Sequence, residues 1–354
     1  MNRSATKAVN GGATMVEPLY VPVLPVRRGP LAAYSGLTPS LRAAVSPLWT
    51  IAPGTDPAAP PGAVAAAQRA MPAWLDARHL EGEPRAVTQG LWPYLLHTPV
   101  RPVTGPGRPD WQRSACADFA RACGNGLGVR VRADEAASER GAESVCRFVE
   151  GLGGPDLARE PLLDLLLDLE AVTEEWHQAD KCALRALELL GPLAVWRSIV
   201  LLAGSFPGSA PVLEGWPPVE AHRHDWDVWH MVRNAQPGLP VDVTYGDYGA
   251  HHAHAADAGS GGGPPWGVLR YTTERTFLLA KAPTEGEGHA ARAREIARRM
   301  IGEPDFRGPG FSEGDRWLHA CATGGGTSGA GNAEAWIRAG HSQHLAYVAR
   351  RLTR

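Results

Sequence analysis

Runs of apolar, strand-forming residues alternate with amphipathic stretches along the first 250 residues of the chain. Such alternation indicates parallel strands, because each strand returns through a crossover segment before it pairs again. The predicted strands are Leu19–Leu24, Val45–Ile51, Arg85–Leu91, Val100–Thr104, Leu127–Ala133, Pro161–Val172, Arg197–Phe206 and Pro240–Gly249. A count of eight favours a (β/α)₈ TIM-like barrel. An open doubly wound sheet is the alternative, since the third and fourth runs are weak, but no Gly-x-Gly-x-x-Gly follows the first strand.

Helical patterns lie between these runs and continue after the last one. Within the barrel we expect helices at Pro30–Ala44, Ala63–Ala77, Asp110–Cys123, Asp134–Glu150, Thr173–Leu190 and Val219–Asn234. After the eighth strand the pattern predicts a Gly-rich loop at His251–Pro265, a hairpin at Trp266–Lys281 and a final barrel helix at His289–Ile301. Two more helices, Gly314–Ala322 and Ala333–Leu352, follow. We therefore expect a disordered tail at 1–17, a barrel at 18–302 with the insert 266–281, and a helical extension at 303–354 packed on the barrel.

Charge and cysteine content exclude several classes of protein. The 354 residues carry 35 Lys and Arg against 37 Asp and Glu, a net charge of −2. This balance argues against a nucleic-acid coat protein but leaves a local basic site open. The five cysteines form no Cys-x-x-Cys pair, so neither a disulfide framework nor a zinc site is indicated. No apolar run reaches the roughly 18 residues of a membrane span, and Met1–Glu17 lacks a signal-peptide core. We expect a cytoplasmic protein without a cofactor.

Two neighbouring predicted strands place charged residues on a shared face. Side chains alternate along a strand, so Asp168 and Glu170 point the same way, late in the sixth strand. Arg130 and Arg132 on the fifth strand point into the barrel by the same argument. Catalytic groups of such barrels lie at the strand C-termini. The four side chains form either an ion-pair layer that closes the barrel or the floor of a pocket for an anionic or sugar ligand.

Other polar residues end the last two strands. Asp247, within Tyr245–Gly249, is the first choice for a general base or a ligand-binding carboxylate, and its alternative role is to cap a turn. Ser205 either binds a ligand or forms a turn. Five histidines, His222 and His224 and then His251, His252 and His254, raise the question of a metal. A Gly-rich loop holds a coordination shell poorly, so we predict no metal site.

The C-terminal region contains a second Gly-rich loop, Gly324–Asn332, directly before a helix. Such a loop can cradle a phosphate at the helix N-terminus. No Lys-Ser or Lys-Thr pair follows it, so it is not a P-loop. The alternative is a linker to a packing helix.

Several short motifs recur in a fixed order along the chain. They are Tyr20–Leu24, Leu167–Leu169, Ser205–Pro207, Gly246–Gly249, Arg270–Thr272, Gly314–Arg316, Gly331-Asn332 with Trp336, and His344-Leu345. In this combination the chain resembles the beta protein family, which is named for a bacteriophage beta protein and is widespread in bacteria. The resemblance implies a bacterial protein in a phage or anti-phage setting and supplies no reaction. The chain departs from the family pattern, which has Arg directly after Trp and Asn-His-His before Leu. Here Ile337 lies between Trp336 and Arg338, and Ser342-Gln343 precedes His344.

Two functional hypotheses follow. The first is a hydrolase-like enzyme that acts on a phosphate- or carboxylate-bearing or sugar substrate at the C-terminal barrel face. In this hypothesis the catalytic residues are Asp247, Asp168 and Glu170. The ligand-binding residues are Arg132, Arg270, Tyr248, Tyr271, Ser205, Arg316, Asn332, Trp336 and His344. The second is a non-catalytic protein that uses the same face to bind a protein or nucleic-acid partner. A concave, charged barrel mouth favours the first, and a flat, aromatic one favours the second.

Overall fold

The structure is a computed structural model. It describes residues 18–56, 60–69, 71–152, 162–208, 215–235, 238–239, 241–256, 267–282, 288–324 and 329–354. The predicted N-terminal tail 1–17 lies outside the described residues, as do residues 257–265 of the first Gly-rich loop, the first residue of the predicted hairpin, and 325–328 of the second loop.

Eight parallel strands form a closed barrel, as the sequence predicts. They are β1 (Tyr20–Pro25), β2 (Leu48–Thr50), β3 (Ala73–Asp76), β4 (Val100–Thr104), β5 (Leu127–Arg132), β6 (Leu163–Ala171), β7 (Trp196–Gly204) and β9 (Val243–Asp247). Strand β1 pairs with β9 through Tyr20 and Tyr245, which closes the ring. The fold is therefore a (β/α)₈ barrel.

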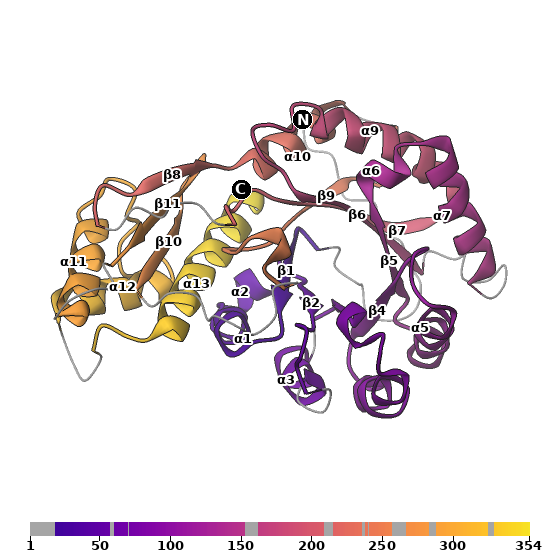
Figure 1. Ribbon diagram of the computed structural model, residues 1–354, viewed down its shortest axis with the longest axis horizontal. Helices are drawn as coiled ribbons and strands as arrows, with labels where there is room; N and C mark the ends of the chain where they lie inside the picture. The colour runs from indigo at the N-terminus through magenta and orange to yellow at the C-terminus, as the bar shows by residue number, and fades with distance from the viewer. Residues whose placement is uncertain are drawn as a thin grey trace.

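Helices and short turns surround the strands (Figure 1). They are α1 (Arg28–Ser35), α2 (Pro39–Arg42), α3 (Pro60–Ala67), α4 (Trp92–Leu95), α5 (Asp110–Cys123), α6 (Ala133–Ala136), α7 (Glu139–Gly151), α9 (Ala179–Leu190), α10 (His224–Ala235) and α13 (Ala333–Leu352). The last helix, α13, packs against α1 and β1, so it takes the place of the eighth barrel helix.

A smaller unit, which we call the satellite, lies beside the barrel at the left of Figure 1. It contains the antiparallel sheet β10-β11-β8, made of β10 (Val268–Thr272), β11 (Thr276–Lys281) and β8 (Val219–His222). Helices α11 (His289–Ile301) and α12 (Glu313–Thr323) cover this sheet and share one core with it. Helix α13 lies between the satellite and the barrel and packs on β10 and α12.

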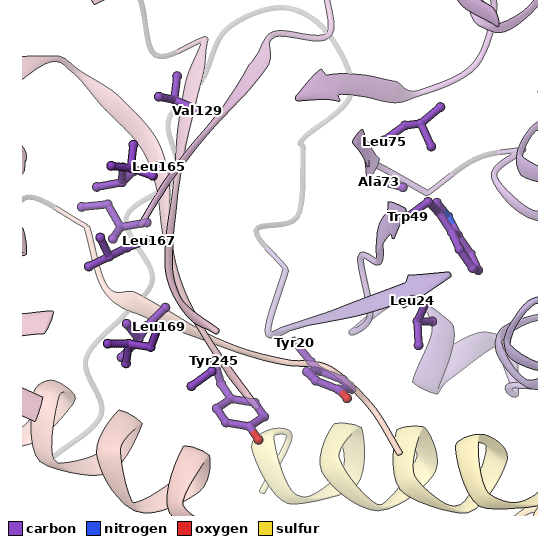
Figure 2. Packing of buried hydrophobic residues seen from close by; sticks show 14 of the residues in the cluster. Tyr20, Leu24, Trp49, Ala73, Leu75, Val129, Leu165, Leu167, Leu169 and Tyr245 are labelled. Atoms are coloured by element: carbon purple, nitrogen blue, oxygen red, sulfur yellow. The ribbon is translucent and has the colours of Figure 1, made fainter. Parts of the chain in front are cut away.

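Two apolar layers stabilise the barrel. Between strands and helices, the outward-facing residues of neighbouring strands pack in one large cluster, which includes Leu24, Trp49, Leu165 and Leu167 (Figure 2). A second cluster fills the inside of the barrel. Its members include Val23, Trp74, Val103, Leu166 and Leu202. Side chains alternate along each strand, so successive residues face the outer and the inner layer in turn. Both faces of a strand are therefore buried, which is why the strand centres are apolar throughout.

The third barrel strand was placed wrongly by the sequence pattern. The predicted strand Arg85–Leu91 contains a π-helical segment, Ala86–Leu91, and the barrel strand is β3. Strand β3 lies inside the stretch Ala63–Ala77 that the pattern assigned to a helix, and helix α3 ends at Ala67. The reason is tertiary, because four fully buried residues pair with β2 and β4 on both sides, which overrides the helix preference of an Ala-rich segment.

Two further assignments also need correction. The predicted helix Val219–Asn234 begins with strand β8, which pairs with β11 some 55 positions later in the chain, and only then continues as α10. Helix α11 has the predicted limits but packs in the satellite core through Ala293, Ile296 and Met300, so it is not the final barrel helix. The predicted hairpin forms with its turn at 273–275. The division into tail, barrel and extension stays a prediction.

Other helix limits differ in detail. The predicted helix Pro30–Ala44 is broken into α1 and α2, and Asp134–Glu150 is broken into α6 and α7. The helix expected from Thr173 begins at Ala179. Among the residues the structure describes, no helix is both long and apolar enough to cross a membrane.

Candidate functional site

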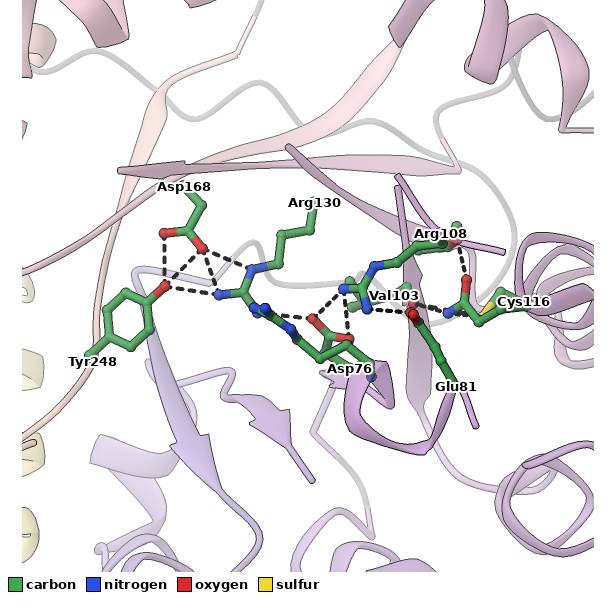
Figure 3. Close-up of polar contacts among 11 residues, drawn as sticks. Asp76, Glu81, Val103, Arg108, Cys116, Arg130, Asp168 and Tyr248 are labelled. Carbon is green, nitrogen blue, oxygen red and sulfur yellow. Dashed lines mark hydrogen bonds and ion pairs between the residues drawn. The ribbon is translucent and has the colours of Figure 1, made fainter. Parts of the chain in front are cut away.

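The C-terminal ends of the barrel strands carry a connected set of charged side chains, which we call the mouth network (Figure 3). Arg130 of β5 lies at its centre. Its Nε and Nη2 donate to Asp168 Oδ2 at 2.9 and 2.6 Å, and its Nη1 donates to Asp76 Oδ2 at 2.9 Å. The hydroxyl of Tyr248 lies 2.8 Å from both oxygens of Asp168 and accepts from Arg130 Nη2 at 2.9 Å. This guanidinium therefore links strands β3, β5 and β6 with the end of β9.

A second arginine completes the network. Arg108, in the loop after β4, donates to both oxygens of Asp76 at 2.9 Å and to Glu81 at 2.7 Å. Burial acts to raise the pKa of Asp76, but Arg108 and Arg130 outweigh it and lower the pKa to about 2. Asp76 is thus ionised at neutral pH with its oxygens engaged, which suits a structural carboxylate better than a proton acceptor.

The rim of the mouth contains Glu170, whose backbone is in the left-handed region at φ 54°. It is the one non-glycine residue with positive φ among those the structure describes. Its amide donates to Asp168 Oδ1 at 2.8 Å, and its carboxylate accepts from Arg132 Nη1 at 3.0 Å. Strained backbone of this kind persists only where the surroundings hold it, and it clusters at functional sites. The ion pairs Arg130–Asp168 and Arg132–Glu170 are those that the strand alternation predicts.

A narrow pocket opens above the network. It is lined by residues from five strand ends and the loop after β9, among them Thr50, Arg78, Arg130, Glu170, Tyr248, His251 and His254. A wider pocket of about 260 Å³ adjoins it, shares Glu170 and His254, and is walled by Arg132, Asp134 and Trp176. The mouth is therefore concave and charged rather than flat and aromatic.

His251 is the buried polar group of the pocket that lacks a partner. Its Nδ1 is withdrawn from solvent and makes no hydrogen bond within the described residues. Burial lowers its pKa to about 3, and the charges of Arg270 and Arg27 act in the same direction. The imidazole is consequently neutral at pH 7. Its ring lies 5.4 Å from that of His341, whose pKa is lowered by burial and by the same Arg270.

Free guanidinium groups surround this histidine. Arg78 lines the pocket, and its side chain makes no ion pair or hydrogen bond with any described residue. Arg270 of β10 is likewise unpaired in the described part of the chain, and burial lowers its pKa to about 10. Arg270 is removed from water without a carboxylate partner, which favours an anion from outside the chain. Arg78 is half-buried, and its charge also acts on Asp76.

Asp247 does not face the mouth. It is separated from Asp168 because it points outward from β9, into a buried network between the barrel and α13. Tyr20 and Tyr245 donate their hydroxyls to it at 2.6 and 2.9 Å, and His344 Nε2 lies at 2.9 Å. Burial acts to raise the pKa of Asp247, but His344 and Tyr20 lower it to about 2. Asp247 therefore lies apart from Asp168 and Glu170, and its role as general base stays a prediction.

The same junction contains two further predicted site residues. Ser205 donates to Asp225, which also accepts from Tyr245. His344 bonds Thr272 Oγ1 through Nδ1 at 2.8 Å, and the neighbouring Gln343 side chain pairs with the backbone of Thr272. These fully satisfied groups join β10, α10 and α13 to the barrel. They do not line the mouth.

The remaining predicted ligand-binding residues lie in or beside the satellite. Tyr271 donates to Asp315 at 2.7 Å. Asn332 caps α13 by accepting from the backbone N–H of Ala335. Trp336 is buried and donates to Ala330 at 2.9 Å, while Arg316 is exposed and pairs with Glu313. None of these four contacts the mouth.

A separate ionic cluster closes the opposite end of the barrel. Asp164 accepts from Arg101, Arg197, Ser198 and the indole of Trp74 at 2.5–3.2 Å. Burial acts to raise its pKa, but the two arginines outweigh this and lower it. With this cluster below and the mouth network above, the apolar interior is enclosed at both ends.

Sequence reasoning missed Asp76, Arg78, Arg108 and His251 as members of the mouth. The misplaced third strand hid Asp76 and Arg78, because Asp76 is the last residue of β3 and Arg78 follows it two positions later. Asp76 ends an apolar run, Ala73–Leu75, and that was the available signal. His251 was noticed only as a possible metal ligand. Among the described residues, no three His, Cys, Asp or Glu side chains gather to hold a metal ion.

Fold and site together define a (β/α)₈-barrel protein with an ion-paired mouth and an α+β satellite. Strand β8 of the satellite precedes α10, and its other elements lie between β9 and α13. The model of the Beta protein family matches residues 20–350, nearly the whole chain. The chain belongs to the Beta protein family.

Comparison with other proteins adds little to this assignment. Among solved structures, alanine racemase from Clostridium difficile 630 in complex with cycloserine matches at 9% identity and a TM-score of 0.32. The match covers 66% of this chain, and the chain spans about half, 51%, of the racemase. No curated protein sequence matches.

Proposed function

We propose that this protein is a hydrolase-like enzyme that binds a small anionic substrate, such as a phosphorylated or carboxylated sugar, at the barrel mouth. The observation that carries the proposal is one pocket in which Arg78, His251 and Glu170 converge at the strand C-termini. The Arg78 side chain forms no hydrogen bond or ion pair with a described residue, although its charge acts on Asp76, and His251 offers an unpaired buried nitrogen. Such a combination of a free cation, a neutral imidazole and a strained carboxylate is typical of a substrate site.

Each group has a distinct role in the proposed reaction. Arg78, with Arg270 nearby, attracts the anionic group, and a guanidinium can bind phosphate or carboxylate through two parallel hydrogen bonds. The wider pocket receives the polar body of the substrate against Trp176 and Asp134. Glu170 accepts the proton of a water that attacks the scissile ester or glycosidic carbon, and the leaving oxygen is protonated from solvent.

In this proposal Asp168 positions other groups and takes no direct part in the chemistry. Its oxygens accept from Arg130, Tyr248 and the Glu170 amide, so little of its capacity is left for substrate. Its contact with the Glu170 amide supports the strained turn.

A thermal-shift and turnover screen tests the proposal. The purified protein is screened against sugar phosphates, nucleoside monophosphates, sugar acids and neutral sugars, with Arg78→Gln and Glu170→Gln beside it. A ligand at a hundred times its Kd stabilises the fold by about 2.7 kcal/mol. We expect stabilisation by an anionic sugar that Arg78→Gln removes, and turnover that Glu170→Gln removes with binding retained.

The matched control is Arg85→Gln, at an exposed arginine of the same loop region that lines no pocket of the mouth. It should behave as wild type. Equal stabilisation of wild type and Arg78→Gln by every ligand that binds would contradict the proposal. So would a complete absence of binding across the anionic compounds.

A further inference from the structure

A groove on the side of the barrel has a chemistry that the mouth does not share. It lies between α10 and the C-terminal half of α13, and the turn at Glu274 and the segment around Arg307 border it. Its volume is about 570 Å³, which is larger than either mouth pocket. We call it the arginine groove.

The lining of the arginine groove is strongly positive. It has a single carboxylate, Glu274, which pairs with Arg351 at 2.6 Å. Its arginines are Arg233, Arg307, Arg350, Arg351 and Arg354. Apart from Arg351, none of these forms an ion pair with a described residue. This local excess stands against a net charge of −2 for the whole chain, so the cations are concentrated here.

Aromatic rings alternate with these guanidinium groups. Arg350 lies 4.3 Å from the centroid of Phe311, and Arg307 lies 4.8 Å from that of Tyr347. On the α10 side, Arg233 lies 5.2 Å from the ring of Trp229. These guanidinium groups lie within cation–π distance of the rings, so positive charge and aromatic surface stand side by side in the groove.

We propose that the arginine groove binds single-stranded nucleic acid. Arginines on α10, on α13 and beside α12 can each meet a different phosphate, whereas a mononucleotide places its charge at one point. Unpaired bases can stack on guanidinium groups and aromatic rings. An acidic peptide has no bases, and a duplex keeps its bases paired and stacked on one another. The inference does not depend on the proposed function, because the groove and the mouth share no lining residue.

Fluorescence anisotropy tests this inference with the full chain. The probes are fluorescein-labelled twelve-nucleotide oligo-dT and oligo-rU, titrated at several salt concentrations. The competitors are the unlabelled single strand, an unlabelled duplex, thymidine monophosphate, uridine monophosphate and poly-glutamate. We expect Arg307→Gln combined with Arg350→Gln to weaken binding at least about tenfold. The slope of log K against log salt should also fall by about 1.4, since each lost phosphate contact removes about 0.7.

The matched control is Arg140→Gln combined with Arg147→Gln on α7, a pair that lines neither the groove nor the mouth. It should bind as wild type. If the groove double variant melts at a lower temperature, the exposed Arg233→Gln repeats the test. The inference is overturned if neither probe binds, if the groove variants leave affinity unchanged, or if duplex, monophosphate or poly-glutamate competes as well as the unlabelled strand.

Discussion

At the scale of single residues, Arg130 explains how a polar barrel mouth can be stable. A buried guanidinium is costly unless it is paired, and this one contacts two carboxylates and a tyrosine hydroxyl. Strand alternation in the sequence was enough to predict its pairing with Asp168. It did not predict Asp76, because that contact depends on where the third strand lies.

Removing one partner from this network tests its energetic weight. We expect Asp76→Asn to lower the free energy of unfolding by about 3–5 kcal/mol, because it leaves Arg108 and Arg130 without a shared carboxylate. Urea unfolding measures the change. Asp118→Asn, which removes an exposed ion pair with Arg121, should cost at most about 1 kcal/mol. Equal losses of unfolding free energy in the two variants would show that the buried network contributes no more than an exposed ion pair.

The lowered pKa values of Asp76 and Asp247 predict acid lability. Both carboxyls have a folded-state pKa of about 2 against an ordinary value of 3.8. A lowered folded pKa stabilises the fold above the unfolded pKa, and that stability is lost as pH falls from about 5 towards 2. Each group accounts for about 2 kcal/mol.

Unfolding free energies measured between pH 7 and pH 3 provide the check. The wild type should lose stability over this range, and Asp247→Asn should lose less because it has one such carboxylate fewer. A variant with the same pH dependence as wild type would show that Asp247 is not held ionised by His344 and Tyr20.

At the scale of elements, the sequence predicted most strands and helices, and its errors have physical causes. The hairpin and helices α11 and α13 were recognised because their patterns are local. Strand β8 was not, because its pairing partner β11 is remote in sequence. Likewise, the place of α13 as the eighth barrel helix depends on contacts with α1 and β1 that no periodicity within α13 reveals.

The crossing of α12 and α13 gives a test at this scale. Gly314 in α12 approaches α13 so closely that a Cβ there would lie 2.1 Å from the carbonyl oxygen of Ala339. We expect Gly314→Ala to force the helices apart and lower stability by about 1–3 kcal/mol. Thermal unfolding is the measurement.

Gly310→Ala is the control, since a Cβ at Gly310 meets nothing within 4 Å and its φ is ordinary. Its melting temperature should stay close to that of wild type. If Gly314→Ala is as stable as wild type, the two helices do not pack as closely as described.

At the scale of the whole molecule, the barrel, the satellite and α13 divide the polar residues into separate groups. The polar motifs that the sequence singles out end up in different places. Asp168 and Glu170 face the mouth, whereas Asp247 and His344 join the barrel to α13. The sequence was enough to predict the barrel and half of the mouth network. It did not predict this separation, because the separation depends on which face of β9 each residue occupies and on how α13 packs against the barrel.

The central claim is that the mouth binds an anion beside His251, and imidazole NMR tests it most directly. Histidine-labelled protein is titrated with inorganic phosphate and with a sugar phosphate, and His251 is assigned from the spectrum of His251→Gln. A bound anion favours the charged imidazole, so the account predicts that both ligands raise the pKa of His251 above about 3, and that Arg78→Gln abolishes the change. If neither ligand changes the pKa of His251, or if both change it equally in Arg78→Gln, the account is contradicted.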